Sequence, residues 1–171
     1  MRVTKEITFE AAHRLRFHRG ACRNLHGHSY RVRVTAAAST KLLEDRELAR
    51  PTDPETGMVV DFGVLAEAMR EVLITGVRRR GDATFHVSPW DHSLIVHKED
   101  PFAEAILAAS MKEELDIGSQ RMIILDVEPT AENMAACIGK EINEKLGIGI
   151  GVVRVELWET ATSCATWEPE A

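Results

Sequence analysis

The sequence predicts an α+β fold in which helices cover one face of an antiparallel four-stranded sheet. Alternating polar and apolar residues indicate strands over residues 3–13 and 26–39 and a hairpin over residues 153–167. Apolar residues at helical spacing occupy much of the sequence between them. Strands, then helices, then strands are typical of this fold class. The 171 residues suit a single domain with a real core, spanning residues 1–171.

The first two predicted strands carry histidines on their apolar faces. His13 ends the apolar face of residues 3–13, and His26 and His28 begin the apolar face of residues 26–39. Side chains two residues apart on a strand point to the same side, so the imidazoles are directed at one layer. Catalytic zinc sites use three protein ligands and keep one position open. The histidines are therefore candidate zinc ligands, with ordinary buried or half-exposed histidines as the alternative.

Cys22 lies in a predicted loop over residues 14–25 that is rich in arginine. It can be a fourth zinc ligand, which would close the site, or a free thiol that acts as base or nucleophile beside the metal. Cationic neighbours favour the thiolate form of such a cysteine. An inert buried cysteine is the third interpretation, and it fits Cys137 and Cys164 better.

The middle of the chain begins with a polar loop over residues 40–56 and a short extended piece over residues 57–62. Asp61 is expected to cap a helix that follows it and that Gly76 ends. Residues 78–81 are predicted to form an exposed basic turn, because a short run of like charges is usually a solvated surface.

A second helix is expected to begin at Pro101, a residue suited to the first helical position, with Phe102 on its buried side. Residues 121–126 are predicted to be a short buried segment. A third helix follows, capped by Thr130 and ended by Gly147.

Glu159 continues the apolar row that Val155 and Leu157 begin in the C-terminal hairpin. A carboxylate at the end of an apolar face costs free energy unless it is paired. A ligand with two adjacent N–H donors would pair it in bidentate fashion, and an arginine of the protein is the alternative partner.

Asp91 and His92 can form part of a proton relay, with the carboxylate orienting the imidazole. Adjacent residues do not readily pair through one backbone, so the sequence alone favours a surface histidine after a helix-start aspartate. The remaining histidines, His18, His86 and His97, are expected to be surface residues.

Composition narrows the functional class. The net charge of −6 argues against a general nucleic-acid surface. No apolar run approaches the roughly 20 residues of a membrane span. The start lacks an apolar signal segment, and three widely spaced cysteines do not suggest a disulfide framework, so we expect a cytoplasmic protein.

Six motifs occur in the order found in the 6-pyruvoyl-tetrahydropterin synthase and 6-carboxytetrahydropterin synthase family, which the chain resembles from residue 9 to about 165. They are Phe9–Leu15, Cys22–Ser29, Gly57–Phe62, Asp91–His92, Pro129–Asn133 and Glu159–Thr160. The resemblance implies the tunnelling (T-) fold, a ring-like homo-oligomer that is typically a hexamer, and active sites at subunit interfaces. Residues 76–127 exceed what compact family members need, which predicts an inserted helix and short strand.

The resemblance also implies residue roles. Catalytic zinc would be bound by His13, His26 and His28. Cys22 would be the general base, with Asp91 and His92 completing the proton transfer. The pterin ring of 7,8-dihydroneopterin triphosphate would be held by Glu159, Thr130 and Glu132. Our own candidates for the triphosphate are Arg14, Arg16, Arg19 and Arg23; for at least two of them, solvated loop charge is the better interpretation.

The segment Glu159–Ala165 resembles the bacterial carboxy-forming enzymes, which yield 6-carboxy-5,6,7,8-tetrahydropterin and acetaldehyde on the route to queuosine and other 7-deazaguanines. The alternative is the pyruvoyl-forming branch, which feeds tetrahydrobiopterin. Two other classes stay open: a zinc hydrolase of an unrelated substrate, although no H-E-x-x-H motif is present, and a non-catalytic, zinc-stabilised pterin-binding oligomer.

Overall fold

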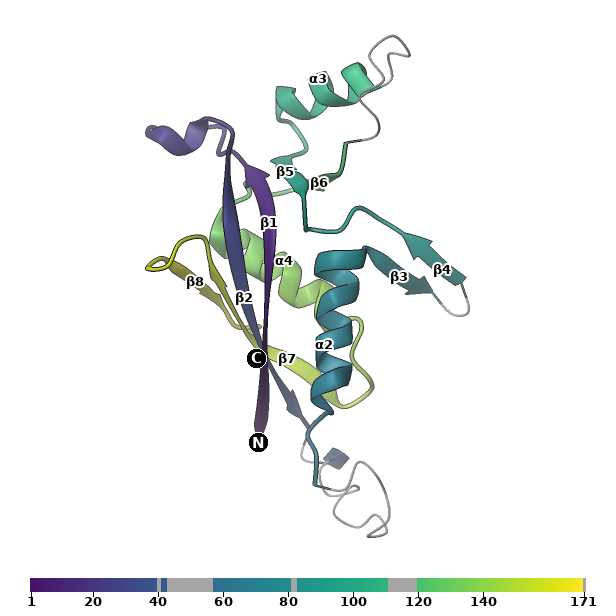
Figure 1. The fold of residues 1–171 in the computed structure, drawn as a ribbon. Coiled ribbons are helices and arrows are strands. Elements are labelled where there is room, and N and C mark those ends of the chain that lie inside the picture. The colour runs from purple at the N-terminus through teal and green to yellow at the C-terminus, as the bar shows by residue number, and fades with distance from the viewer. Residues whose placement is uncertain (40, 43–56, 81–82, 111–119, 171) are drawn as a thin grey trace.

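The fold is built on one six-stranded sheet, seen in a computed structural model that describes residues 1–39, 41–42, 57–80, 83–110 and 120–170 (Figure 1). The strand order is β6-β5-β1-β2-β7-β8. The strands are β1 (Arg2–His13), β2 (His26–Ala38), β5 (Ser93–His97), β6 (Met122–Leu125), β7 (Ile150–Trp158) and β8 (Cys164–Trp167). Most of the predicted loop over residues 40–56 lies outside the described residues.

The four predicted antiparallel strands are β1, β2, β7 and β8, and they pair as expected. The prediction of a four-stranded sheet was nevertheless incomplete, because β5 and β6 extend the β1 edge in parallel orientation. All five residues of β5 are buried, so the strand lacks the polar alternation by which the other strands were found. The segment over residues 76–127 therefore adds more than one helix and one short strand.

Two helices cover the inner face of the sheet. They are α2 (Phe62–Arg70), which continues through a π-helical turn at Glu71–Thr75, and α4 (Ala131–Asn143). Leu65 and Met69 of α2 join Met134 and Ile138 of α4 in one core with the inward side chains of β1, β2 and β7. Figure 1 shows β1 and β2 passing in front of α4.

The expected helix starts after Asp61 and Thr130 and the end at Gly76 are confirmed, but α4 ends at Asn143, before the predicted Gly147. The Asp61 side chain accepts a hydrogen bond from the Gly63 N–H, and Thr130 Oγ1 accepts one from the Asn133 N–H at 3.3 Å. Gly76 ends the π-helical turn with φ of 63°, a left-handed conformation that glycine adopts without strain. The predicted extended piece over residues 57–62 is instead a turn and a bend that lead into α2.

The helix α3 (Pro101–Ser110) corrects the expectation that all helices share one face. Ala103 packs with Leu94 and Val96 of β5 and with Ala12, whose side chain points away from the inner face. Phe102, predicted to be buried, is 41% exposed. The inserted segment thus adds a small second core on the outer face of the sheet.

Two other predicted segments differ from the structure. Residues 78–80 belong to a hairpin of β3 (Val77–Arg80) and β4 (Ala83–His86), while residue 81 lies outside the described residues. The predicted buried segment over residues 121–126 holds the edge strand β6, where Ile124 is 49% exposed. In the described residues, no helix is both long and apolar enough to cross a membrane.

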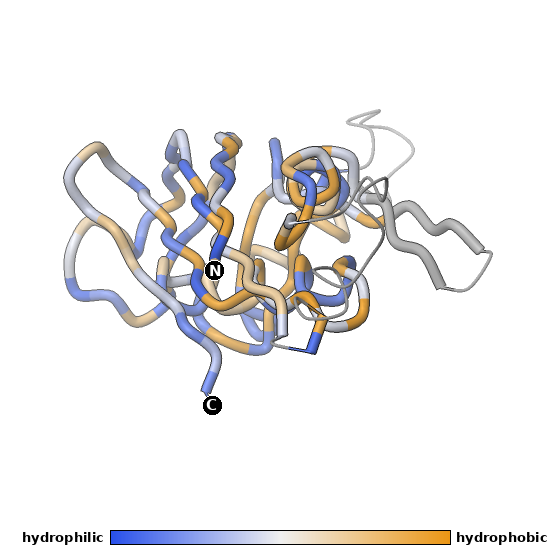
Figure 2. Tube along the Cα trace, turned by 90° about the horizontal axis from the view of Figure 1, so that it is seen from below, coloured by the Kyte–Doolittle hydropathy of each residue, from blue (hydrophilic) through white to orange (hydrophobic). Residues whose placement is uncertain are grey.

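Alternating hydropathy is visible along the long strands in Figure 2. In β7 the alternation changes phase where the β2–β7 register shifts between Thr35 and Ala36. On the N-terminal side of this irregularity in β7, Val152 is buried and Val153 is only partly buried. The irregular pairing changes which face of the sheet these side chains point to.

Gly76 provides a test of the fold near the segment that leads to Asp91. A Cβ at Gly76 would meet the Val87 carbonyl oxygen and Pro89, and its positive φ is unfavourable for alanine. We expect Gly76→Ala to lower the free energy of unfolding by about 3 kcal/mol or more, measured by urea denaturation. Gly57→Ala is the matched control, because Gly57 has a φ of 75° but open space around it; it should cost about 1 kcal/mol. Equal losses would contradict the steric account.

Candidate functional site

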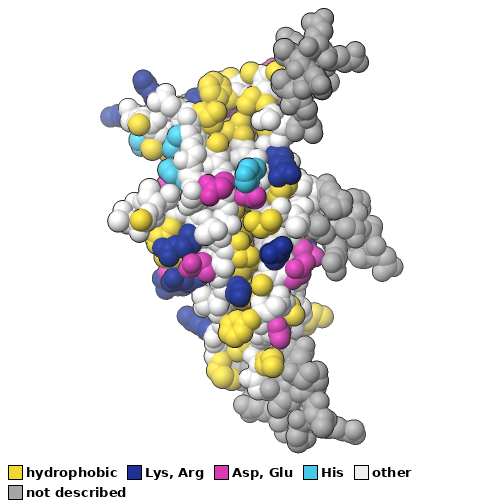
Figure 3. Space-filling view, in the orientation of Figure 1, with side chains coloured by type: hydrophobic (Ala, Val, Ile, Leu, Met, Phe, Trp, Pro, Cys, Tyr) yellow, Lys and Arg dark blue, Asp and Glu magenta, His cyan; other side chains and the backbone are white. Residues whose placement is uncertain are grey.

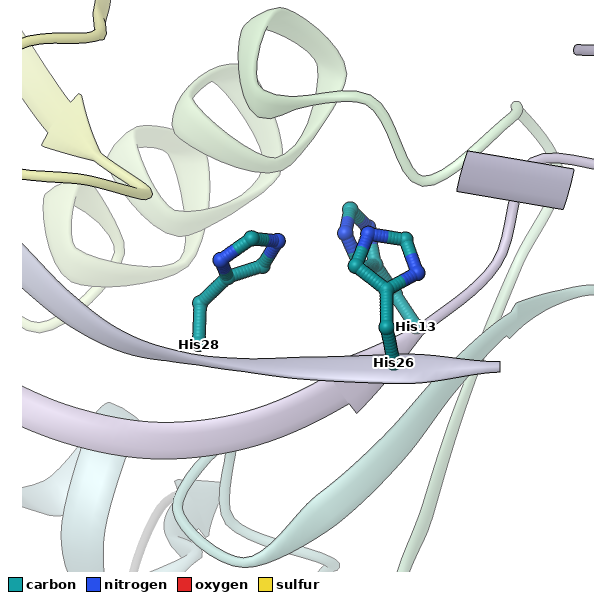
Figure 4. A group of neighbouring side chains, drawn as sticks. All are labelled: His13, His26 and His28. Carbon is teal, nitrogen blue, oxygen red and sulfur yellow. The ribbon is translucent and has the colours of Figure 1, made fainter. Parts of the chain in front are cut away.

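Three histidines converge at the end of the β1–β2 pair. The antiparallel register places His13 opposite His26, and His28 lies opposite Ala11, one step further along the same face. Nitrogen atoms of the three side chains lie within 4.8 Å of one another. Figure 4 shows the three rings gathered over the two strands and facing α4. The predicted convergence on one layer is therefore confirmed, and the cluster can hold a metal ion.

The hydrogen bonds of the cluster leave nitrogens available as ligands. His13 Nδ1 lies 2.8 Å from the Pro129 carbonyl oxygen and His26 Nδ1 lies 2.8 Å from that of Asn24. Because a carbonyl only accepts, each Nδ1 carries the proton and each Nε2 keeps its lone pair. Carbonyl partners of this kind commonly fix the orientation of metal-binding histidines. The residues thus fit a divalent cation that prefers imidazole ligands.

His13 is the most buried of the three, with 2% of its surface exposed. Burial lowers the pKa of its imidazole to about 4, and nearby His26 and His28 act in the same direction, whereas the Pro129 hydrogen bond opposes it. The ring is therefore neutral near pH 7, as metal binding requires. Its Nε2 is buried and has no hydrogen-bond partner among the described residues. A buried acceptor of this kind costs free energy unless a ligand satisfies it.

Glu159 lies immediately after β7, with its Oε1 3.7 Å from His13 Nε2. Burial raises the pKa of the Glu159 carboxyl, and the neighbouring His28 and His26 partly oppose this shift. In the part of the chain that the structure describes, no arginine forms an ion pair with Glu159. The carboxylate therefore lacks the protein partner that the sequence had left as an alternative.

A single pocket brings together five of the predicted site residues. Its walls include Cys22, Thr130, Glu132 and Glu159 beside His13. Cys22 lies in a short 3-10 turn, η1 (Ala21–Arg23), and is partly buried.

The same pocket is also lined by Cys164. The sequence favours an inert buried cysteine at this position, but the Cys164 thiol is exposed. The motif Glu159-Thr160-Ala161-Thr162-Ser163-Cys164 is the sequence signal that could have placed Cys164 at this pocket. Cys137 fits the inert interpretation, because burial raises the pKa of its thiol.

Asp91 and His92 do pair, contrary to the expectation from their adjacency. His92 Nδ1 lies 2.8 Å from Asp91 Oδ2, and the other oxygen, Oδ1, accepts a hydrogen bond from the Glu10 N–H at 2.9 Å. His92 has a φ of 56°, which turns its side chain back toward the preceding residue. This left-handed conformation is uncommon outside glycine and could not be read from the sequence. The carboxylate is thus fixed while the imidazole is 67% exposed.

The Asp91–His92 pair and Cys22 lie at different pockets of the chain. His92 lines a pocket with Glu10, Gly27 and Ser29. Glu10 and Ser29 alternate with the inward-facing histidines along β1 and β2, so their side chains point to the outer face. Within one chain the predicted proton-transfer residues are therefore divided between the two faces of the sheet.

Ion pairs occupy the middle of the outer face, where Figure 3 shows basic and acidic side chains together. Glu6 pairs with Arg33 at 3.1 Å, and both Arg31 and Arg33 lie over the Trp158 ring. These arginines have nearby acidic and aromatic partners, which indicates a structural role.

The four candidate arginines of the Cys22 loop fall into two groups. Arg14 pairs with Asp100 at 3.4 Å, and Arg16 pairs with Glu128 at 2.6 Å. Arg19 and Arg23 are exposed. Of the histidines expected at the surface, His18 is exposed, but His97 is only 8% exposed and its Nδ1 accepts from the Glu99 N–H. The side chain of His86 lies outside the described features.

Comparisons with known proteins agree with this geometry. The family described as 6-pyruvoyl tetrahydropterin synthase matches residues 2–170. A relative from Rickettsia bellii, named 6-carboxy-5,6,7,8-tetrahydropterin synthase, is 33% identical over 162 residues, which cover 94% of each chain.

Solved structures show the same fold. A crystal structure of an uncharacterized protein from Wolinella succinogenes has a TM-score of 0.66 and 22% identity, covering 99% of this chain and 98% of that one. The 6-pyruvoyl tetrahydropterin synthase of Caenorhabditis elegans has a TM-score of 0.55 and 20% identity, covering 99% and 96%. The chain is an enzyme that belongs to the 6-pyruvoyl tetrahydropterin synthase family.

Proposed function

We propose that the chain is a zinc-dependent carbon–oxygen lyase acting on 7,8-dihydroneopterin triphosphate. It eliminates triphosphate and cleaves the side chain, giving 6-carboxy-5,6,7,8-tetrahydropterin and acetaldehyde for queuosine and other 7-deazaguanines, and it acts in the cytoplasm. The observation that carries the proposal is a single pocket whose walls join His13 of the three-histidine cluster to Glu159 and Cys22. The name of the Rickettsia relative supports the carboxy-forming reaction.

The three histidines would hold Zn²⁺ through ring nitrogens, with Cys22 outside the ligand set. When bound, the ion acts as a Lewis acid on substrate oxygen and lowers the barrier to proton removal from the neighbouring carbon. A three-histidine set leaves a coordination position for substrate. The fixed protons on His13 Nδ1 and His26 Nδ1 support this assignment.

Glu159 would anchor the pterin ring through two adjacent N–H groups. Glu159 is half-buried and has no guanidinium partner among the described residues, so it would gain most from a bidentate donor, because such hydrogen bonds are charge-assisted. Thr130 and Glu132 line the same pocket and would help to orient the ring. The exposed Arg19 and Arg23 would bind the triphosphate, since Arg14 and Arg16 already have carboxylate partners.

Cys22 would remove the substrate proton, and the Asp91–His92 pair would shuttle protons at the same substrate. Because that pair opens on the outer face of its own chain, it would serve the Cys22 pocket of a neighbouring subunit. This arrangement requires a homo-oligomer, for which the family resemblance suggests a hexamer. The fixed carboxylate and exposed imidazole of the pair suit contact with another chain.

Product analysis tests the reaction. Purified protein incubated with 7,8-dihydroneopterin triphosphate should release 6-carboxy-5,6,7,8-tetrahydropterin and acetaldehyde, as measured by liquid chromatography and mass spectrometry. We expect Cys22→Ala to keep its zinc and to lose at least about 100-fold in kcat, because general-base catalysis contributes that much.

A pyruvoyl product would support the tetrahydrobiopterin branch instead. Unchanged substrate with zinc bound would contradict both branches and favour the non-catalytic pterin-binding oligomer. Loss of zinc from Cys22→Ala would make the thiol a ligand rather than the base.

Subunit mixing tests the shared site. Cys22→Ala and His92→Ala should each be inactive alone. Randomly co-assembled from equal amounts of both chains, they should recover about a quarter of the wild-type activity. Each shared site has a one-half chance of an intact Cys22 and an independent one-half chance of an intact His92 from the neighbouring chain. A site formed within one chain would recover no activity, since every chain carries one defect.

A further inference from the structure

Two arginines at the base of the Cys22 loop are held by carboxylates from distant parts of the sequence. Arg14 Nε lies 3.4 Å from Asp100 Oδ2, and its side chain is 16% exposed while that of Asp100 is fully buried. The Arg14 guanidinium also lies 4.2 Å from the centre of the Phe102 ring. The charge of Arg14 is thus enclosed by the start of α3, within the inserted segment.

The turn that presents Asp100 is itself fixed by hydrogen bonds. The Asp100 N–H donates to the His97 carbonyl oxygen at 2.9 Å, and Asp100 Oδ1 accepts from the Phe102 N–H at 3.0 Å. Buried His97 accepts from the Glu99 N–H at 3.0 Å. One carboxylate oxygen of Asp100 is therefore held against the helix start while the other faces Arg14. A preset partner of this kind loses little conformational entropy on pairing.

Arg16 is held by Glu128 at two points. Glu128 Oε1 accepts from Arg16 Nε at 2.6 Å, and Oε2 accepts from the Arg16 backbone N–H at 3.2 Å. Glu128 therefore fixes the backbone of the loop as well as one side chain. The next residue, Pro129, orients His13 through its carbonyl oxygen. The segment Glu128–Pro129, just before α4, thus fixes both His13 of the three-histidine cluster and the loop that carries Cys22.

Cys22 is tied to this anchored backbone. The Leu15 N–H, between the two arginines, donates to the Cys22 carbonyl oxygen at 2.9 Å. A shift of residues 14–16 would therefore move the thiol relative to the histidines. Misplacing a catalytic group by about 1 Å can cost about 100-fold in rate.

We propose that Asp100 and Glu128 are positioning residues: they clamp Arg14 and Arg16 and so hold Cys22 beside the three-histidine cluster. The proposal gives the inserted segment a role, because Asp100 reaches the loop from it. It rests on the proposed function for the role of Cys22 in turnover. The ordering of the loop itself is independent of that function.

Glu128→Gln tests the clamp in the zinc-loaded oligomer. We expect hydrogen–deuterium exchange over residues 14–25 to accelerate about tenfold, kcat to fall at least about tenfold and KM to change less than about twofold, with zinc content unchanged. Glu128→Asp should recover part of kcat. Asp100→Asn should act in the same direction, and Glu128→Gln keeps the test usable if Asp100→Asn does not fold.

Glu99→Gln is the matched control. Glu99 contacts the same Arg16 at 3.3 Å, but its side chain is 69% exposed, and exposed ion pairs contribute little. It should leave exchange and kcat unchanged within about twofold. The clamp would be overturned if Glu128→Gln changed neither the exchange rate nor kcat. It would also be overturned if Glu128→Gln raised KM without changing exchange, because that result would assign these arginines to triphosphate binding. A wild-type protein that leaves substrate unchanged would overturn the proposed function alone, because exchange reports the clamp separately.

Discussion

The antiparallel register of β1 and β2 is the constraint on which the candidate site depends. It sets His13 opposite His26 and keeps His28 on the same face. Because side chains alternate along a strand, a slip of one residue would send His26 and His28 to the outer face. The same register buries Val32 and Val34 under the helices, so the apolar core and the histidine cluster are specified together. Folding the sheet therefore assembles the three-histidine cluster.

Burial then determines the chemistry of the cluster. Burial of His13 lowers the pKa of its imidazole and keeps the ring neutral, although the hydrogen bond to Pro129 opposes that shift. The Pro129 carbonyl holds the proton on Nδ1, which leaves Nε2 as the free nitrogen. Glu159 is brought close to this nitrogen at the end of β7. A carboxylate beside a three-histidine cluster suits a metal ion with a ligand that carries N–H donors. In the proposed function, this arrangement would place the metal ion beside the bound pterin.

The sequence was most informative for features that depend on local periodicity and neighbouring residues. The parity of β1 and β2, the Thr130 cap and the Gly76 terminus all depend on neighbouring residues, and all were predicted. The parallel strand β5 was missed because it is buried throughout and has no alternation.

Ion pairs between residues far apart in the sequence could not be predicted either. Arg14 and Arg16 appeared to be free loop charges, but their partners Asp100 and Glu128 lie 86 and 112 residues further along the chain. The Asp91–His92 contact depends on one backbone angle for which the sequence gives no signal.

The central claim is that the three histidines form an open metal site beside a free thiol. X-ray absorption spectroscopy at the zinc edge of the purified oligomer tests it most directly. The account predicts only nitrogen and oxygen ligands, at about 2.0–2.2 Å. A sulfur ligand at about 2.3 Å would contradict it, because Cys22 would then close the site.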